Sequence, residues 1–477
     1  MTADAAPLSQ THVYEEEEDP RQHLMLDPRP REEMNSMVME AMHTTTRSYW
    51  IVVGVLTLVV LVCLFGAWGY MIAKGMGVAG IRRPTMWGIF IANFVFWIGI
   101  SHAGTFVSAI LRVFKAEFRR PFTRAAELMT TFGLAAAAMY PFIHLGRTWV
   151  AYWMVPIPNQ RQLWPNMRSP LAWDMIAITT YLLSSTIYLY LPLIPDVAMA
   201  RDRSTGWRYK FYRLLALGWR GTETEWHNLR TAINIFAFAI IPIMFSVHTI
   251  VSWDFAVSQT PGWHSTIYGP FFVSGAIFSG VSAVAMILFL IRTTMVNMKY
   301  FVREEHFDAL GKLMLIFSFT WAYFYFNEYM VEWYGGDLAA KTVLKAFTQP
   351  PYGWIWYLML FCNIAVPWLL LWNKRVRRTP WLMFVIGFLI NIGMYAERFI
   401  IVPTEISTNR FPFMWGDYIP RIELVISVGS LALFLLLYAL ASRLIPLIPV
   451  WEVQEGQLAH TLRRVGKQEV ATKSELE

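Results

Sequence analysis

The chain has 477 residues, of which 56% are hydrophobic and 15% are charged, whereas an ordinary soluble domain has about 25% charged residues. The net charge of +7 resides in segments between apolar stretches, so it does not indicate nucleic-acid binding. Cys63 and Cys362 are the two cysteines, and each lies inside an apolar stretch. Two thiols exclude a Cys-ligated iron–sulfur cluster and a disulfide framework, and no CxxCH motif for haem attachment occurs.

The first 45 residues are polar, carry an acidic run at 15–19 and lack the apolar core of a signal peptide. Because they also contain Pro20, Pro28 and Pro30, we expect residues 1–45 to form an extended arm that becomes ordered only against a partner. Residues 447–477 form a polar tail, for which we expect a short surface helix. The charged residues behind this expectation are Glu452, Glu455, His460, Arg463 and Arg464.

Between the arm and the tail, residues 46–446 contain ten apolar stretches. A spanning helix needs roughly 20 mostly apolar residues, and a soluble protein could not bury so many helices that are apolar on every face. We therefore predict an all-α polytopic membrane protein. In chain order the predicted spans are 49–73, 86–111, 123–146, 171–195, 231–257, 265–291, 307–333, 352–373, 379–402 and 423–446.

The loops between the spans predict the orientation of the chain. If the N-terminus is inside, the inner loops carry about twice as many Lys and Arg residues as the outer loops. Basic residues concentrate in cytoplasmic loops, so both termini are predicted to be cytoplasmic. The basic run 374–378 is the clearest marker and is expected to contact lipid phosphates. The long inner loop 196–230, rich in Trp and Arg, is predicted to lie along the membrane surface.

Several spans carry ionisable residues in the outer third of the membrane. Such groups are expensive inside a bilayer unless they are paired, so they are functional candidates. A simpler interpretation, in which a side chain at a helix end reaches toward the headgroups, stays open for Arg147, Glu332 and Arg398. The outer candidates and their tryptophan neighbour are His144, Arg147, Trp173, Asp174, His248, Asp254, Glu328, Glu332, Glu397 and Arg398.

His144 and Asp174 are the strongest of these candidates, because they face each other across one outer loop. A His–carboxylate pair beside aromatic residues suits the oxidation of a quinol. Two hydroxyl protons must leave as two electrons depart, so a base must lie within hydrogen-bond reach of the ring oxygens. Histidine has a suitable pKa for this task, and the aspartate can orient it or take the proton onward.

The electrons from such a reaction need an acceptor. A non-covalent b haem would need two histidines at matching depth on facing helices. The sequence places His102 near mid-membrane, His248 in the outer half and His144 at the outer edge, so these depths do not match. We therefore predict that this chain binds no haem or iron–sulfur cluster, and that the acceptor belongs to another subunit docked on the outer face.

Four short segments carry a resemblance to a known family: Tyr140-Pro141-Phe142-Ile143-His144-Leu145-Gly146-Arg147, Trp173-Asp174, Phe326-Asn327-Glu328-Tyr329 and Glu397-Arg398-Phe399. They resemble the polysulfide-reductase-type (NrfD-like) family of quinone-handling membrane subunits. The ten spans and the long N-terminal arm are similar, more specifically, to the ActC subunit of bacterial alternative complex III. The resemblance covers about residues 46–446.

This resemblance implies two four-helix bundles, spans two to five and six to nine, with one further helix at each end. It also implies a bacterial cell membrane, and a menaquinol or ubiquinol site near the outer face. The implied partners are c-type haem subunits, an iron–sulfur subunit and a second related membrane subunit. By position, His144 and Asp174 would contact the quinol, with Arg147, Trp173, Asp254, Glu328 and Arg398 nearby.

A second polar line runs toward the inner side. It comprises Ser101, His102, Thr105 and Ser108 on the second span, with Glu127 on the third. One interpretation is interhelical hydrogen bonding with close packing of small residues. The other is a proton half-channel, with His102 as relay and Glu127 at its mouth. Almost no other acid occurs in the inner half of residues 46–446 to extend this line. Proton pumping through it is therefore a hypothesis.

Three classes of function fit these features. The first is the quinol-oxidising subunit of a respiratory or photosynthetic electron-transfer complex. The second is a structural membrane anchor of such a complex, without a site of its own. The third is a secondary transporter with its substrate among the outer carboxylates. Transporter spans are often broken at mid-membrane, whereas here the prolines lie mostly toward span ends, with Pro242 and Pro367 as the exceptions.

Overall fold

The structure is a computed structural model that describes residues 26–27, 29–81, 86–155, 167–335, 338–407, 420–459, 462–465 and 468–471. Within these residues, ten helical segments are long and apolar enough to cross a membrane. The prediction of an all-α polytopic membrane protein is therefore confirmed.

Five spans are single α-helices: α7 (Pro170–Asp202), α9 (Glu223–Ala256), α10 (Tyr268–Thr294), α12 (Glu304–Gly335) and α19 (Ile422–Leu444). The others join α-helices to π- or 3₁₀-helical turns: α2 (Arg47–Val59), η1 (Val60–Gly66) and α3 (Ala67–Lys74); α4 (Ile89–Thr105), η3 (Phe106–Ile110) and α5 (Leu111–Val113); η4 (Glu117–Phe122) and α6 (Thr123–His144); α14 (Gly353–Leu360), η6 (Phe361–Ala365) and α15 (Val366–Leu370); α17 (Pro380–Phe399), η7 (Ile400–Thr404) and α18 (Glu405–Ser407). Outside the spans lie α1 (Arg31–His43), η2 (Met76–Val78), η5 (Thr148–Met154), α8 (Gly206–Leu215), α11 (Met298–Phe301), α13 (Leu338–Thr348), α16 (Lys374–Arg377), α20 (Val450–Ala459), and an antiparallel hairpin of β1 (Leu462–Val465) and β2 (Gln468–Ala471).

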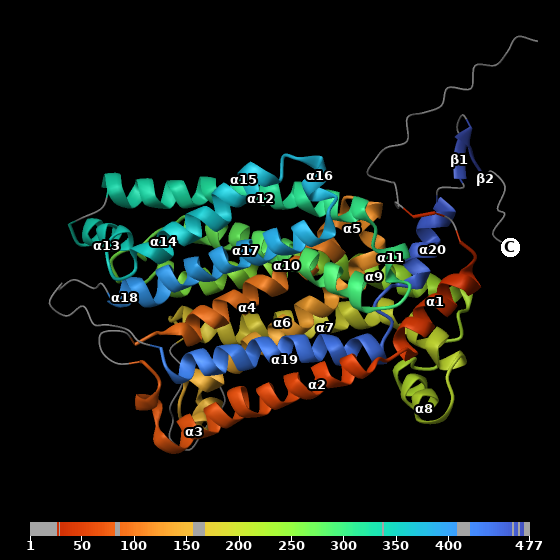
Figure 1. Ribbon diagram of the computed structural model, residues 1–477, viewed down its shortest axis with the longest axis horizontal. Helices are drawn as coiled ribbons and strands as arrows, with labels where there is room; N and C mark the ends of the chain where they lie inside the picture. Colours follow the sequence, from red (N-terminus) through yellow and green to blue (C-terminus); the bar gives the residue numbers. More distant parts are fainter. Residues whose placement is uncertain are drawn as a thin grey trace, which may run out of the picture.

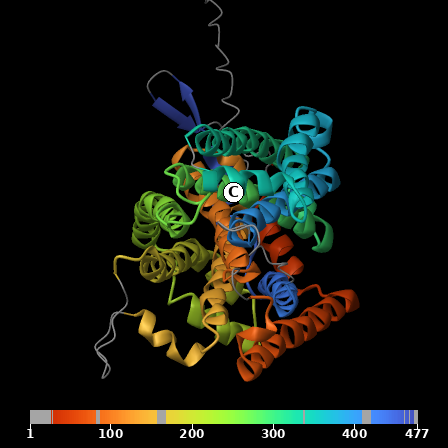
Figure 2. The ribbon, with the colours of Figure 1, turned by 90° about the vertical axis from the view of Figure 1, so that its left-hand side faces the viewer.

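Eight spans form two four-helix bundles. The first contains α4, α6, α7 and α9, and the second contains α10, α12, α14–α15 and α17. Helix α10 lies at the junction, because it packs on α4 and α9 as well as on α12 and α17 (Figure 1). The first and last spans, α2–α3 and α19, pack against each other, and α19 also contacts α6 (Figure 2). The two flanking helices are thus neighbours in space.

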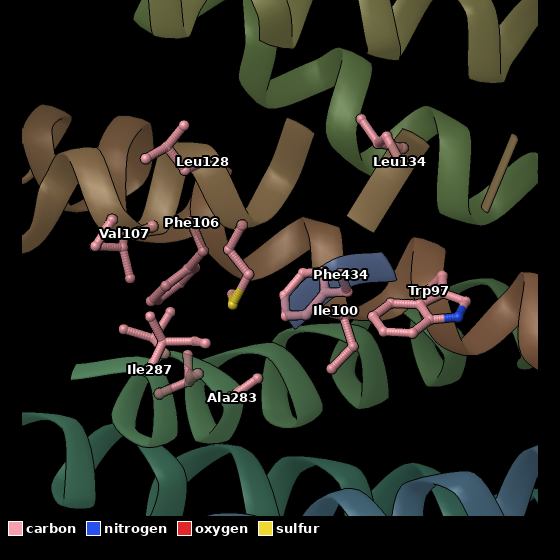
Figure 3. Close-up of a cluster of buried hydrophobic side chains, with 14 of the residues drawn as sticks. Trp97, Ile100, Phe106, Val107, Leu128, Leu134, Ala283, Ile287 and Phe434 are labelled. Carbon is pink, nitrogen blue, oxygen red and sulfur yellow. The ribbon is translucent and has the colours of Figure 1, made fainter. Parts of the chain in front are cut away.

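The helices run along the long axis of the molecule, so its two ends have distinct contents (Figure 1). We call the end with α3, α13 and α18, on the left of Figure 1, the site end. We call the opposite end, with α1, α8 and α20, the tail end. Between them, apolar side chains from both bundles and from α19 form a continuous core (Figure 3). Its labelled members are Trp97, Ile100, Phe106, Val107, Leu128, Leu134, Ala283, Ile287 and Phe434.

Four spans contain a π-helical turn, which widens the helix locally and often marks a functional site. In η7 the cause is visible. Pro403 has no N–H group and would break an ordinary α-helix at this point. The wider turn carries the helix past Pro403, and the hydroxyl of Thr404 donates to the carbonyl oxygen of Phe399 at 3.3 Å. The span therefore continues as far as Ser407.

Both terminal regions differ from the prediction within their described residues. Residues 31–43 of the expected extended arm form α1, which buries Met34, Val38 and Met42. The expected surface helix is α20, but Glu452 and Val453 on it are buried. Apolar residues at helical spacing drive both elements into the tail end of the bundles. His460 lies outside the described residues, and Arg463 and Arg464 belong to β1.

The tightest helix contact in the first bundle predicts a mutational effect. A Cβ atom on Gly104 of α4 would lie 2.0 Å from the carbonyl oxygen of Ala126 on α6, whereas one on Gly99 would have its nearest neighbour at 3.5 Å. We expect Gly104→Ala to force these helices apart, at a cost of about 1–3 kcal/mol. Gly99→Ala on the same helix is the matched control. Thermal denaturation in detergent should show a lower midpoint for Gly104→Ala alone, and equal midpoints would contradict the contact.

Candidate functional site

At the site end of the first bundle, two aspartates meet. Asp174 lies one turn into α7 and Asp254 near the end of α9, and these helices pack against each other in antiparallel directions. Their carboxyl groups interact directly. Two charged carboxylates in direct contact repel each other, and a pair of this kind is stabilised when it shares one proton. Beside them, the rings of Trp173 and Trp253 form an edge-to-face pair with centroids 6.0 Å apart.

This region contains polar atoms that lack partners. Nδ1 of His144, Oδ1 of Asp174 and Oδ1 of Asp254 are each buried and have no hydrogen-bond partner among the described residues. Buried polar atoms are normally satisfied by protein or by bound molecules. A ligand with hydroxyl groups, which can donate and accept, therefore suits the chemistry of this group.

Asp174 was predicted to pair with His144, but in the structure its neighbour is Asp254. His144 is the last residue of α6, at the same end as Asp174. The carboxyl on Asp174, however, is that of Asp254, and no hydrogen bond to His144 occurs in the described part of the chain. A role for His144 with Asp174 stays a prediction. Arg147, three residues after His144, is exposed.

The second bundle carries its own acids at the site end. Glu328 and Glu332 on α12 and Glu405 on α18 are buried and interact electrostatically. The hydroxyl of Ser265 donates to Glu328. Glu405 was missed because the ninth span was predicted to end at residue 402, before Pro403. Its position eight residues after Glu397, on the same helical face, was the available signal.

Arg398 lies deeper than the sequence suggested. It forms an ion pair with Glu397, and the other oxygen of that carboxylate accepts a hydrogen bond of 2.8 Å from the indole of Trp321. Trp321 precedes Glu328 by seven residues on α12, a distance of about 10 Å along the helix. Arg398 therefore belongs to a buried layer of the second bundle, not to the outer edge beside Asp174. Its guanidinium lies 5.0 Å from the ring centroid of Phe272.

Next to this layer, His102 and His248 are in contact. Their ring centroids are 4.6 Å apart, and both residues are fully buried. The expectation that they lie at different depths is wrong, because α4 packs against α9 with these two rings in direct contact. A mismatch of depths therefore no longer argues against a haem between these two histidines. That this chain binds no haem stays a prediction.

From His102 a polar line continues toward the tail end. Nδ1 and Nε2 of His102 lie 2.7 Å and 2.9 Å from the carbonyl oxygens of Ile98 and Met244. Thr105 and the hydroxyl of Tyr181 are hydrogen-bonded at 2.7 Å. The predicted members Ser101 and Ser108 are buried, and each donates to a backbone carbonyl on its own helix.

Glu127 lies at the end of this line nearer the tail end, within a cluster of ion pairs. Arg124 contacts Glu127 at 3.6 Å and Asp196 at 3.1 Å. The expectation that almost no other acid occurs here is wrong in two respects. Helix α7 continues beyond its predicted end at residue 195 and buries Asp196, and α20 brings in Glu452 from the tail.

Glu452 connects the tail to the first bundle. Its carboxylate lies 3.1 Å from Arg119 and 3.5 Å from Arg112. Burial alone would raise the pKa of Glu452, but the surrounding arginines outweigh it and hold this pKa below its usual value. The carboxylate is therefore charged at neutral pH, and it anchors α20 against the bundle.

Comparisons with known proteins agree with this architecture. The family described as Polysulphide reductase, NrfD matches residues 77–408. A protein of Halobacterium salinarum, provisionally named as a membrane subunit of dimethyl sulfoxide reductase, is 25% identical over 83% of this chain and 90% of its own length. The Hdr-like menaquinol oxidoreductase integral membrane subunit of Archaeoglobus fulgidus is 24% identical over 83% and 93%. The menaquinone reductase integral membrane subunit of Nitratidesulfovibrio vulgaris is 23% identical over 83% and 92%.

The buried pair of Glu397 and Arg398 predicts a non-additive effect on stability. Removing one partner leaves the other as an uncompensated buried charge, which costs about 3–5 kcal/mol, whereas replacing both by apolar residues is often close to neutral. We expect Glu397→Leu and Arg398→Leu each to lower the thermal midpoint in detergent more than the double variant does. A double variant at least as unstable as the sum of both single changes would contradict the pair.

Proposed function

Because this chain belongs to the Polysulphide reductase, NrfD family, we propose that it binds and oxidises a quinol within a multi-subunit oxidoreductase. The proposed substrate is menaquinol or ubiquinol, and the site end faces the outer side of a bacterial cell membrane with both termini in the cytoplasm. The names of two relatives, which include menaquinol and menaquinone, support a quinol as substrate. The long arm and the ten spans make an ActC-type role in an alternative complex III the most specific form of the proposal.

The observation that carries the proposal is the acid pair at the site end with its unpartnered atoms. Asp174 and Asp254 present buried oxygens beside two tryptophan rings, and His144 presents a buried nitrogen at the same end. A quinol has a flat apolar ring and two hydroxyl groups. The tryptophans would contact the ring, and the carboxyl pair and His144 would accept the protons.

The electrons need a path out of this chain. Cys63 and Cys362 lie on different spans, and two thiols are too few for an iron–sulfur cluster. We therefore place the acceptor in an iron–sulfur subunit on the outer face, followed by c-type haem subunits, with a second related membrane subunit beside this one.

Two other functions predict different behaviour. A structural anchor would not need unpartnered buried atoms, which destabilise a site that holds nothing. A transporter needs a route to both sides at mid-membrane, but here mid-membrane is filled by the contact of His102 and His248 and by the pair of Glu397 and Arg398. Both features favour the quinol site.

Replacing a proton acceptor tests the site. We expect His144→Ala, Asp174→Asn and Asp254→Asn each to lower quinol oxidation by the assembled complex roughly 10²-fold or more, the usual scale for losing an acid–base group. Turnover can be followed with a short-chain quinol and an artificial electron acceptor. Thr179→Val is the matched control, because Thr179 is exposed on α7 and bonds only its own helix. Full turnover in assembled variants, together with no extractable quinone in the complex, would favour the anchor.

The second part of the proposal is a proton path through His102, Ser101, Ser108 and Glu127, with His248 as an added member. Both ring nitrogens of His102 face carbonyl oxygens, but a neutral imidazole can donate to only one of them. A second proton would complete the other hydrogen bond. His248 has no hydrogen-bond partner for either ring nitrogen among the described residues, so it is available to exchange a proton with a neighbour.

Replacing His102 by Leu distinguishes a proton path from a structural role. If the path carries protons, His102→Leu should abolish any protons translocated beyond those that quinol oxidation itself releases, while oxidation without a membrane potential continues. Proton release per electron can be measured in vesicles in which the presence of every subunit has been verified. A normal ratio in an assembled variant would refute the path, and failed assembly would indicate the structural role.

A further inference from the structure

A cavity of about 370 Å³ opens at the tail end, far from the proposed quinol site. It is lined by the start of α1, the last turns of α7, the segment 219–226 and the start of α20. Four arginines and three tryptophans contribute to its wall: Arg31, Arg201, Arg203, Arg220, Trp219, Trp226 and Trp451. Nothing in the proposed electron or proton chemistry uses this cavity.

The charges of the cavity do not cancel. Arg201 is held by Asp202 through two hydrogen bonds of 2.7 Å and 3.2 Å. Arg203 is held by Glu32 at 2.6 Å. The third acid of the wall, Asp196, is already paired with Arg124 at 3.1 Å.

After these pairings, two guanidinium groups remain. Arg31 and Arg220 have no carboxylate partner among the described residues, and both are exposed. Two unpaired guanidinium groups at the wall of one cavity give it a net positive charge, which favours an anion.

Two indole N–H groups converge in the same cavity. Gly221 has a positive φ of 78°, which a glycine adopts without strain. The position that a Cβ would take there lies 3.8 Å from Nε1 of Trp219 and 3.8 Å from Nε1 of Trp226. Neither nitrogen donates to an acceptor in the described part of the chain. The two rings are edge to face at 5.1 Å, and Trp451 packs on Trp226 at 5.5 Å, so the donors are held in place.

The surroundings of the cavity are those of a membrane surface. Helix α8 connects Arg203 to the segment around Trp219 and lies at the tail end (Figure 1). It and its end expose Trp207, Leu214 and Leu217, next to the basic residues Arg208, Lys210 and Arg213. Such a helix lies in the plane of the interface between lipid headgroups and acyl chains.

We propose that this cavity binds a phosphate ester, and that its source is the headgroup of an anionic phospholipid. Arginine side chains bind phosphate oxygens through paired donors, and the two indole groups supply further donors to the same oxygens. Basic cavities at the cytoplasmic ends of membrane helices are suited to this class of lipid. A bound lipid would connect α1, α7 and α20, which approach one another around this cavity.

The test uses the purified, delipidated protein in its complex. Phosphatidylglycerol, phosphatidylcholine and inorganic phosphate are the three probes, and native mass spectrometry measures bound lipid while thermal stabilisation measures both lipid and phosphate. We expect phosphatidylglycerol to bind and phosphatidylcholine to bind much more weakly. The double variant Arg31→Gln/Arg220→Gln should bind phosphatidylglycerol about tenfold more weakly or worse, as expected for two basic groups.

Two further variants separate the site from general charge. Lys341→Gln/Lys345→Gln removes the same charge from exposed residues of α13 at the site end and should leave binding unchanged. Trp226→Phe retains the ring but removes one donor and should weaken binding without lowering the midpoint of the lipid-free protein. If inorganic phosphate stabilises the protein but phosphatidylglycerol does not bind, the cavity is an anion site whose ligand is free phosphate and not a lipid headgroup. Equal binding of both lipids, or equal loss in both double variants, would overturn the proposal.

Discussion

A charged side chain cannot be left without a partner in the middle of a bilayer, and this constraint organises the whole molecule. Its ionisable residues lie in three layers along the helices. The pair of Asp174 and Asp254 lies at the site end, and Glu397 and Arg398 lie deeper. Arg124, with Glu127 and Asp196, lies toward the tail end. Each layer includes a contact between helices: Asp174 of α7 with Asp254 of α9, Trp321 of α12 with Glu397 of α17, and Arg124 of α6 with Asp196 of α7. The polar contacts that make these groups tolerable therefore also favour particular helix pairs.

The two ends of the bundles meet this constraint differently. At the site end, Asp174, Asp254 and His144 of the first bundle and Glu328 of the second have buried atoms without hydrogen-bond partners among the described residues, whereas such atoms are normally satisfied by protein or by a bound molecule. Deeper in the second bundle, Glu397 is satisfied by Arg398 and Trp321. Helix α10 connects the two bundles, because Phe272 contacts both Arg398 and His248. A change of charge in one bundle thus has a short physical route to the other.

The regions outside the spans are part of the same arrangement. Glu452 on α20 neutralises arginines at the end of the first bundle, and α1 packs beside α20 and α19. Polar ends of membrane helices need partners where they meet the headgroups, and here the tail supplies a carboxylate. In the adjacent cavity, Arg31 and Arg220 have no carboxylate partner among the described residues, so the proposed anionic headgroup would complement their charge.

The sequence alone determined the ten spans, because a long apolar run has no other stable structure in water or lipid. It also singled out Asp174, Asp254 and Glu328 as acids near one end of the spans, since an ionisable residue in such a run is conspicuous. Only the tertiary structure decided which of them meet. Hydropathy gives each residue a depth along its own helix, but the packing of α4 on α9 brings His102 to His248, and the turn at Pro403 carries Glu405 into the second bundle. Likewise, nothing local shows that Glu452 is buried, because its partners lie more than 300 residues earlier in the chain.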